Sequence, residues 1–227
     1  MKDFIRPCLF TTLTLAAPAT AHAATGRETL IETAFVERDR AIALAQIAAA
    51  EASATATLGR APTDAEALMT RAIATSYRAK LTHNRSDALS AKAQFEALVT
   101  QFPRDAEAQA ALGAWHLSAV KSLGALMARG GLGARKAAGL DAIDRAVVLG
   151  GNRALFPGIA GLLRLSIDPR DPRGIALIGQ ATHASVTTAL DRLIQRRAAQ
   201  LDLVLKGGDV RLVQALANRL LPLGQFR

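Results

Sequence analysis

The chain has 227 residues and a formal net charge of +9, with 50% hydrophobic but only 4% aromatic residues. This length is sufficient to bury one sizeable core. Its single cysteine, Cys8, lies in the leader described below, which excludes a disulfide framework, a thiol nucleophile and a cysteine metal site in the mature chain. Alternating patterns typical of strands are missing, whereas Ala and Leu, both strong helix formers, dominate. The composition therefore predicts an all-α protein.

The first residues have the organisation of a cleaved leader. Lys2 and Arg6 precede an apolar stretch over residues 9–19, and Ala-His-Ala follows at residues 21–23. The apolar stretch is shorter than the about 20 residues that a membrane anchor needs. We therefore expect a signal peptide over residues 1–23, cleavage after Ala23, a periplasmic location and no transmembrane segment in the mature chain.

Removal of this leader leaves a net charge of about +8, so the mature chain stays basic. Basic chains attract polyanions such as nucleic acid, lipid head groups and acidic envelope polymers. The arginines, however, are scattered among acidic residues and form no long basic run, which favours solvated helix surfaces. We expect no nucleic-acid partner, and binding to an anionic envelope polymer or to a small acidic ligand stays open.

The N-terminal half reads as a series of helices with recognisable ends. Thr25 and Glu28 fit a capping box, and the helical pattern that follows, over residues 28–58, leaves one helix or two open. Residues 59–62 end this pattern. Further helices are expected from Thr63 or Asp64 to about Leu81, from Ser86 or Asp87 to Phe102, and from Asp105 to about Leu126.

The second half continues in the same manner. We expect a loop at residues 129–133, a helix through Leu140 and Val147, a turn at residues 150–152 and an Asp171-Pro172 helix start. The last helices are expected at about 156–167, 173–182, 185–205 and 209–221, with residues 224–227 frayed. The final helix is strongly amphipathic, and we expect it to seal the end of the fold rather than to lie on a membrane.

A spaced signature occupies the middle of the chain. Its positions are Ala91, Phe95, Pro103, Ala106, Leu112, Gly113 and His116. This spacing resembles the junction of two tetratricopeptide repeats. Asp-Ala-Glu-Ala after Pro62 also recurs after Pro103 at an offset of 41 residues, seven more than the typical repeat of about 34. The surplus is about two helical turns, which keeps the side chains in phase.

This resemblance implies a right-handed superhelix of stacked antiparallel helical hairpins, in one domain over residues 24–222. The repeats are best over residues 62–150, and residues 168–222 are expected to form an atypical helical cap. It also implies a non-catalytic interaction module that holds a protein or peptide partner in a concave groove. Tyr77, Trp115 and His116 are the groove residues we expect, with Arg71 and Arg78 as charged neighbours.

Two alternative functions stay open. Exported helical-repeat proteins resemble partner subunits of bacterial substrate-binding transport systems, and a carried ligand predicts an internal apolar cavity. An accessory factor or enzyme acting on an anionic envelope polymer instead predicts a continuous basic surface. Arg197 falls near an apolar stripe of its helix and is expected either to line the groove or to extend its stem over the core.

Other candidate sites are weaker. Residues 131–136 lack the spacing and hydroxyl of a phosphate-binding loop, but Arg129, Arg135 and Lys136 beside a helix start offer an anion site, against the alternative of an ordinary turn. His83, His116 and His183 lie far apart and predict no metal site. We expect no cofactor and no catalytic residue, because no nucleophile and base occur at a recognisable spacing.

Overall fold

The computed structural model describes residues 25–226, so the expected signal peptide and its cleavage site lie outside the described residues. Within this part of the chain there are eleven α-helices and no strand, which confirms the all-α prediction. In chain order the helices are α1 (Gly26–Phe35), α2 (Arg40–Arg60), α3 (Ala65–Thr82), α4 (Arg85–Gln101), α5 (Ala106–Leu123), α6 (Ala125–Leu132), α7 (Lys136–Leu149), α8 (Leu155–Ile167), α9 (Pro172–His183), α10 (Ala189–Lys206) and α11 (Val210–Leu220).

Polar caps explain most helix starts. The capping box of Thr25 and Glu28 forms as expected, and side chains of Asp64 and Asp105 accept hydrogen bonds from the first turns of α3 and α5. Asp171 caps α9 with Pro172 at its first position. Residues 28–58 form two helices rather than one, because the chain breaks after α1 and the Asp39 side chain caps the start of α2.

Two helix boundaries differ from the sequence prediction. Gly124, with φ of 77°, ends α5, and the chain starts again as α6. The loop expected at residues 129–133 is therefore wrong, because residues 129–132 form the last turn of α6 and only Gly133 takes a left-handed cap conformation. The expected helix start at residue 185 is also wrong, because Thr188 caps α10 in a capping box with Asp191.

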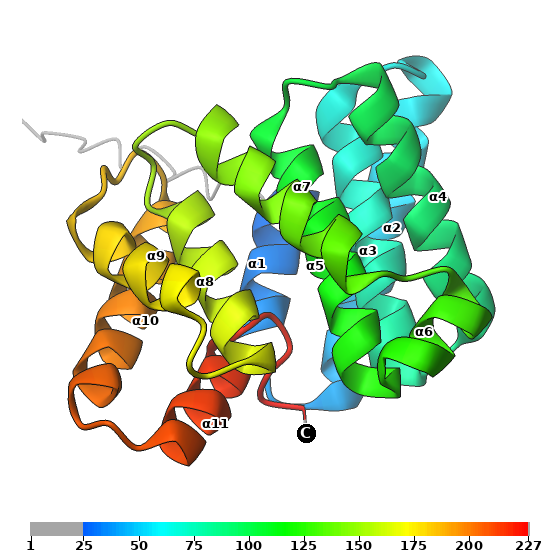
Figure 1. Cartoon of the computed structure of the whole chain (residues 1–227). Coiled ribbons are helices and arrows are strands. Elements are labelled where there is room, and N and C mark those ends of the chain that lie inside the picture. The colour runs from blue at the N-terminus through cyan, green and yellow to red at the C-terminus, as the bar shows by residue number, and fades with distance from the viewer. Residues whose placement is uncertain (1–24, 227) are drawn as a thin grey trace, which may run out of the picture.

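Helices that follow each other in the chain pack side by side, notably α2 with α3, α3 with α4, and α8 with α9, and α5 packs on α7 across the short α6. Figure 1 shows these helices running in alternating directions. Small residues allow the close crossing of α5 and α7. A Cβ atom at Gly113 would lie 2.5 Å from Cγ2 of Ile143, and one at Gly139 would lie 2.7 Å from Cγ of Leu117. This contact gives a physical reason for the glycine of the Leu112-Gly113 pair.

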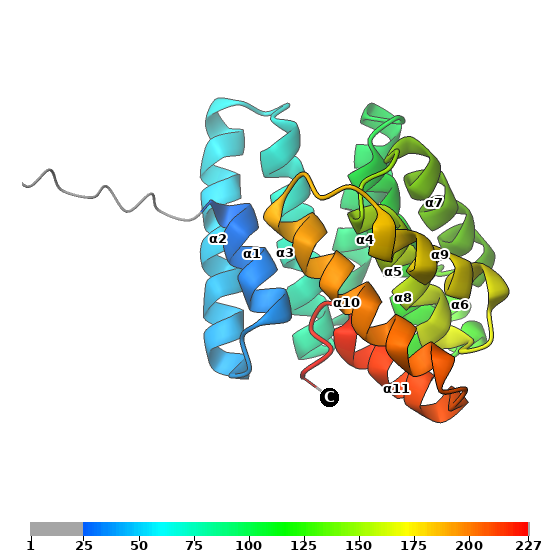
Figure 2. The ribbon, with the colours of Figure 1, turned by 90° about the vertical axis from the view of Figure 1, so that its left-hand side faces the viewer.

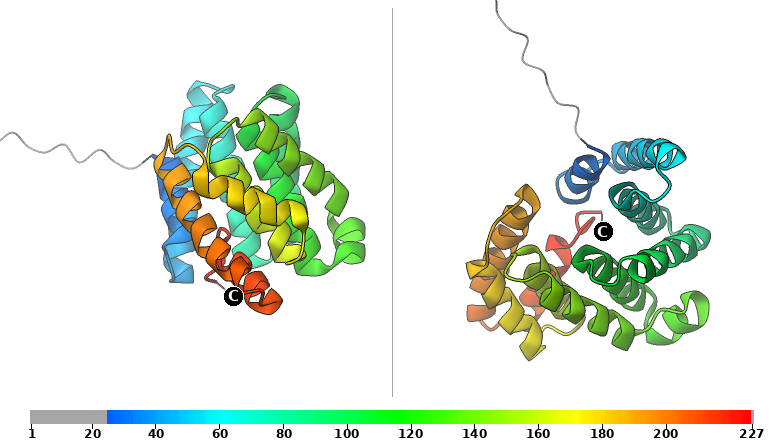
Figure 3. Two further views of the ribbon diagram at one scale, coloured as in Figure 1. Left: turned by 60° about the vertical axis from the view of Figure 1, so that its left-hand side comes forward. Right: turned by 90° about the horizontal axis from the view of Figure 1, so that it is seen from above.

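The helices surround a common centre. Seen from above, they form an open ring, with α1 and α10 on the two sides of its gap (Figure 3). Residues 221–226, which we call the tail, follow α11 and run inside the ring toward α1 (Figures 2 and 3). The prediction of a frayed end is wrong for residues 224–226, because the tail packs on the core and its Leu223 is only 1% exposed.

The core consists of connected apolar clusters rather than one centre. The largest joins buried side chains of α5, α7, α8, α9, α10 and α11. The terminal helix α11 contributes Val213, Leu216 and Leu220 to this cluster. That it seals the end of a solenoid stays a prediction. Another cluster joins α3, α4 and α5 around Phe95 and Trp115, and a smaller one joins α1, α2, α3 and the tail.

Within the described residues, α2 is long and apolar enough, by length and composition alone, to cross a membrane. One such helix is weak support for a span, and α2 packs a regular stripe of Ala43, Ile47, Ala50 and Ala54 against the rest of the protein. The absence of a transmembrane segment stays a prediction.

Candidate ligand-binding cavity

A cavity of about 860 Å³ lies inside the ring. Its walls come from α1 to α6, from α8 and α10, and from the tail. This volume falls within the range of about 300–1,000 Å³ that is usual for small-molecule sites. We call it the central cavity.

A row of small side chains on α5 makes room for the cavity. Ala110, Ala114, Ser118 and Ser122 line it at successive steps of four residues, and Ala111 lies beside this row. Residues four apart lie on one face of a helix, so this row gives α5 a face of small side chains. The row is visible in the sequence as small residues at helical spacing, but nothing in the sequence shows that the facing helices stay away from it.

The opposing walls are apolar. They include Leu30 and Phe35 of α1, Ile73 of α3, Ile159 and Leu163 of α8, Leu190 of α10, and Leu223 and Phe226 of the tail. Residues from both ends of the chain therefore meet across the cavity. A ligand with an apolar body would lose its contact with water on all these surfaces.

Two of the predicted groove residues line the central cavity. Trp115 is 7% exposed, and its Nε1 donates a hydrogen bond to the carbonyl oxygen of Ala88 at 3.0 Å, which fixes the indole against α4. Tyr77 lies on α3 in the same cavity. Burial raises the pKa of Tyr77 to about 12, although the charge of Arg27 opposes this shift.

The other predicted groove residues do not line the cavity. His116 lies behind Trp115, with ring centroids 5.1 Å apart, and its Nδ1 accepts a hydrogen bond from the Arg135 amide at 3.3 Å. Burial lowers the pKa of His116, which favours its neutral form. Arg78 instead ties α2 to α4 by pairing with Glu51 and, at 2.8 Å, with Asp87. Arg71 is half-buried outside the cavity wall.

A chain of ion pairs crosses one end of the cavity. Arg27 of α1 pairs with Glu107 of α5, and Arg153, before α8, lies 3.6 Å from Glu107 and 3.3 Å from Asp191 of α10. Arg27 and Glu107 are both cavity-lining residues. These contacts join elements from both sides of the ring.

Asp191, the last residue in this series of ion pairs, is fully buried. Burial alone would raise its pKa, but hydrogen bonds from Thr187, Thr188 and the Leu155 amide, together with the charge of Arg153, lower the pKa of Asp191 to about 2. The carboxylate therefore stays ionised and holds the start of α8 against the start of α10. Its role is structural, and the sequence shows it only through the capping pattern of Thr188.

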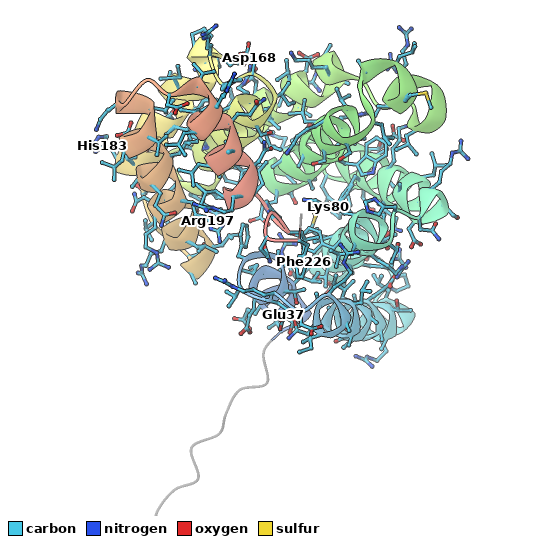
Figure 4. All side chains as sticks on the ribbon, turned by 90° about the horizontal axis from the view of Figure 1, so that it is seen from below. Glu37, Lys80, Asp168, His183, Arg197 and Phe226 are labelled. Atoms are coloured by element: carbon cyan, nitrogen blue, oxygen red, sulfur yellow. The ribbon has the colours of Figure 1, made fainter. Side chains whose placement is uncertain are left out.

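The tail is held inside the ring by hydrogen bonds to α1 and α3. The Leu223 amide donates to the carbonyl oxygen of Ala34 at 2.7 Å, and Nε2 of Gln225 donates to the carbonyl oxygen of Glu37 at 2.8 Å. Lys80 Nζ donates to the carbonyl oxygen of Pro222. Figure 4, viewed from below, places Lys80 and Phe226 in the middle of the ring, with Arg197 and Glu37 on either side.

Arg197 of α10 links the C-terminal ends of α11 and α1. Its guanidinium donates to the carbonyl oxygen of Leu220 at 2.6 Å and to that of Phe35 at 3.1 Å, and it lies 4.6 Å from the centre of the Phe35 ring. These carbonyls end α11 and α1, where a cation is favoured by the helix dipole. Arg197 thus neither lines the central cavity nor simply extends over the core.

The predicted anion site takes a different form from a phosphate-binding loop. Arg129 lies in the last turn of α6, Arg135 is the residue before α7, and Lys136 is its first residue. The Arg135 amide donates a hydrogen bond to Nδ1 of His116.

No group of three metal-binding side chains occurs among the residues that the structure describes.

No protein-family model, curated protein or solved structure matches this chain. The resemblance to tetratricopeptide repeats therefore stays a prediction, and the central cavity is assigned from its geometry alone.

Proposed function

We propose that this chain is an exported, non-catalytic binding protein whose central cavity holds a compact ligand with an apolar body. The observation that carries this proposal is the cavity of about 860 Å³ with apolar walls from both ends of the chain. An internal apolar cavity is what a carried ligand predicts. Of the open functions, a helical-repeat partner subunit of a periplasmic substrate-binding transport system fits this feature best.

The proposed architecture is a right-handed superhelix of tetratricopeptide-like hairpins, with residues 168–222 as a helical cap. Side-by-side packing of consecutive helices and the glycine crossing of α5 and α7 support it. In such repeat proteins the concave surface is the usual binding surface. Here that surface is narrowed by the tail, which favours a compact ligand over a long peptide strand.

The charges around the cavity favour a ligand with an acidic end. Cavity-lining cations are Arg27, Arg40, Lys80, Arg85 and Lys121, whereas Glu107 is the one carboxylate residue in the described lining. Complementary charge favours encounter with an anion and its orientation in the site. A molecule with an apolar body and a carboxylate or phosphate head group has the matching chemistry.

A cavity-filling variant tests the proposal. Ala114 lies in the middle of the small row on α5, and Ala114→Phe would place an aromatic ring in the space a ligand needs. We expect wild-type protein to bind the apolar fluorophore N-phenyl-1-naphthylamine. We expect Ala114→Phe to weaken this binding, which raises the dissociation constant about tenfold or more. The readout is fluorophore emission in an equilibrium titration.

The matched control is Ala52→Phe, which adds the same ring on an exposed position of α2. It is expected to leave the dissociation constant unchanged. Equal affinity of Ala114→Phe and Ala52→Phe, or no binding by the wild type, would contradict a ligand in the central cavity.

A further inference from the structure

The junction of α5 and α6 exposes an unusual amount of apolar surface. Leu126 is 84% exposed, Met127 is 66% exposed and Leu123 is 48% exposed. All residues from 122 to 127 are exposed, and we call this segment the α5–α6 corner. Figure 1 shows α6 at the edge of the molecule, beside the end of α5. Adjacent protruding apolar side chains of this kind mark an interaction surface.

The corner is held in place from behind. Ala128 and Ala134 are buried in the core, and the Ala134 amide donates to the carbonyl oxygen of Ala128 at 3.0 Å. Arg85 of α4 donates from Nη2 to the carbonyl oxygen of Gly131 at 2.8 Å. The exposed Leu126 and Met127 therefore belong to an anchored helix, so their exposure is a fixed feature of this surface.

The surroundings of the corner are positively charged. Lys121 precedes it, Arg129 follows it on α6, and the Arg85 guanidinium lies against the same helix. Arg135 and Lys136 follow at the start of α7. No aspartate or glutamate occurs in the sequence between Glu107 and Asp141. The neighbouring helix α4 carries Asp87 and Glu96, which pair with Arg78 and Lys92. Exposed apolar side chains flanked by the cations Lys121, Arg129 and Arg85 match an anionic lipid surface.

The corner also adjoins the central cavity. Leu123 and Met127 are exposed and line the cavity at the same time, so they lie at its mouth. Contact of this corner with a bilayer would place the mouth at the lipid head groups. An apolar ligand would then pass between membrane and cavity with little exposure to water.

We propose that the α5–α6 corner is a membrane-docking surface that inserts Leu126 and Met127 among the lipids of a bilayer with anionic head groups. The bilayer is favoured over a protein partner because the exposed apolar side chains are few and are flanked by cations. Stable protein interfaces bury much larger and flatter areas. This inference goes beyond ligand binding, and vesicle binding is measured without any ligand.

The test is flotation of the chain with vesicles of phosphatidylcholine, with and without phosphatidylglycerol. We expect binding to the anionic vesicles, weaker binding to the neutral ones, and a decrease as salt rises. The double variant Leu126→Asp with Met127→Asp is expected to lower binding about tenfold or more. Leu126→Trp is expected to increase it, because tryptophan favours the membrane interface.

The control is a double variant with the same charge change at apolar residues that are exposed elsewhere, Val148→Asp with Leu203→Asp. The proposal is overturned if the two double variants bind equally, or if wild-type protein floats with neither vesicle. A protein partner at this corner would give the second of these outcomes. Loss of fluorophore binding by Ala114→Phe reports on the cavity separately, so the two proposals fail independently.

Discussion

Single buried polar residues fix how distant helices meet in this protein. Asp191 accepts hydrogen bonds from Leu155, Thr187 and Thr188 and pairs with Arg153. Asp191→Ala would leave several of these donors buried without an acceptor, which is expected to lower the free energy of unfolding by about 3 kcal/mol. Urea unfolding measures this change. Asp202→Ala, which removes an ion pair with Lys206 on the same helix, is expected to cost less than about 0.5 kcal/mol.

The same residue predicts a pH dependence. The pKa of Asp191 is about 2 in the folded chain and near 3.9 in an unfolded one. The unfolded state therefore binds more protons between these values, so stability is present above about pH 4 and is lost as the pH falls toward 2. This shift corresponds to about 2 to 3 kcal/mol. The wild type should lose stability more steeply than Asp191→Ala between pH 4 and 2, and parallel curves would contradict this.

At the level of residues, the sequence predicts local chemistry better than long-range contacts. The caps at Thr25, Asp64, Asp105 and Asp171 follow from the residues next to them. Trp115, predicted as a groove residue, lines the cavity. His116, one residue further on, faces the core instead, because a helix turns by about 100° per residue.

The tail shows how one short element completes the ring. Leu223 packs with Leu30, Ala34 and Ile47, far away in sequence, and its amide bonds to Ala34. Leu223→Asp would bury a carboxylate among apolar groups and is expected to lower the free energy of unfolding by about 3 kcal/mol. Leu203→Asp, at an exposed position, is expected to change it by less than about 0.5 kcal/mol.

Urea unfolding of both variants measures the difference. Equal stability of Leu223→Asp and Leu203→Asp would show that the tail is not held on the core.

The tail could not be predicted from its own sequence, because its few apolar residues resemble a frayed end and its partners lie in α1 and α2. The helix break at Gly124 was missed because the apolar spacing of the predicted helix continues across it through Leu123 and Leu126.

On the scale of the whole molecule, the ring and its cavity depend on both ends of the chain. Arg197 and the tail connect α11 to α1. The ion pairs of Glu107 with Arg27 and Arg153 connect α1, α5 and the start of α8. An all-α fold was predictable from composition and helical spacing. The cavity was not, because its volume is set by the distance between α1, α5 and α8, which no local pattern specifies.

The most direct measurement is the reactivity of a single cysteine placed in the cavity, in a chain whose Cys8 is replaced by serine. Ala114→Cys is treated with N-ethylmaleimide, with and without saturating N-phenyl-1-naphthylamine, and Ala52→Cys serves as the exposed control. A ligand inside the ring predicts that the fluorophore slows modification of Ala114→Cys about tenfold or more and leaves Ala52→Cys unchanged. An unchanged rate at Ala114→Cys with the fluorophore bound would place the ligand elsewhere and contradict the central claim.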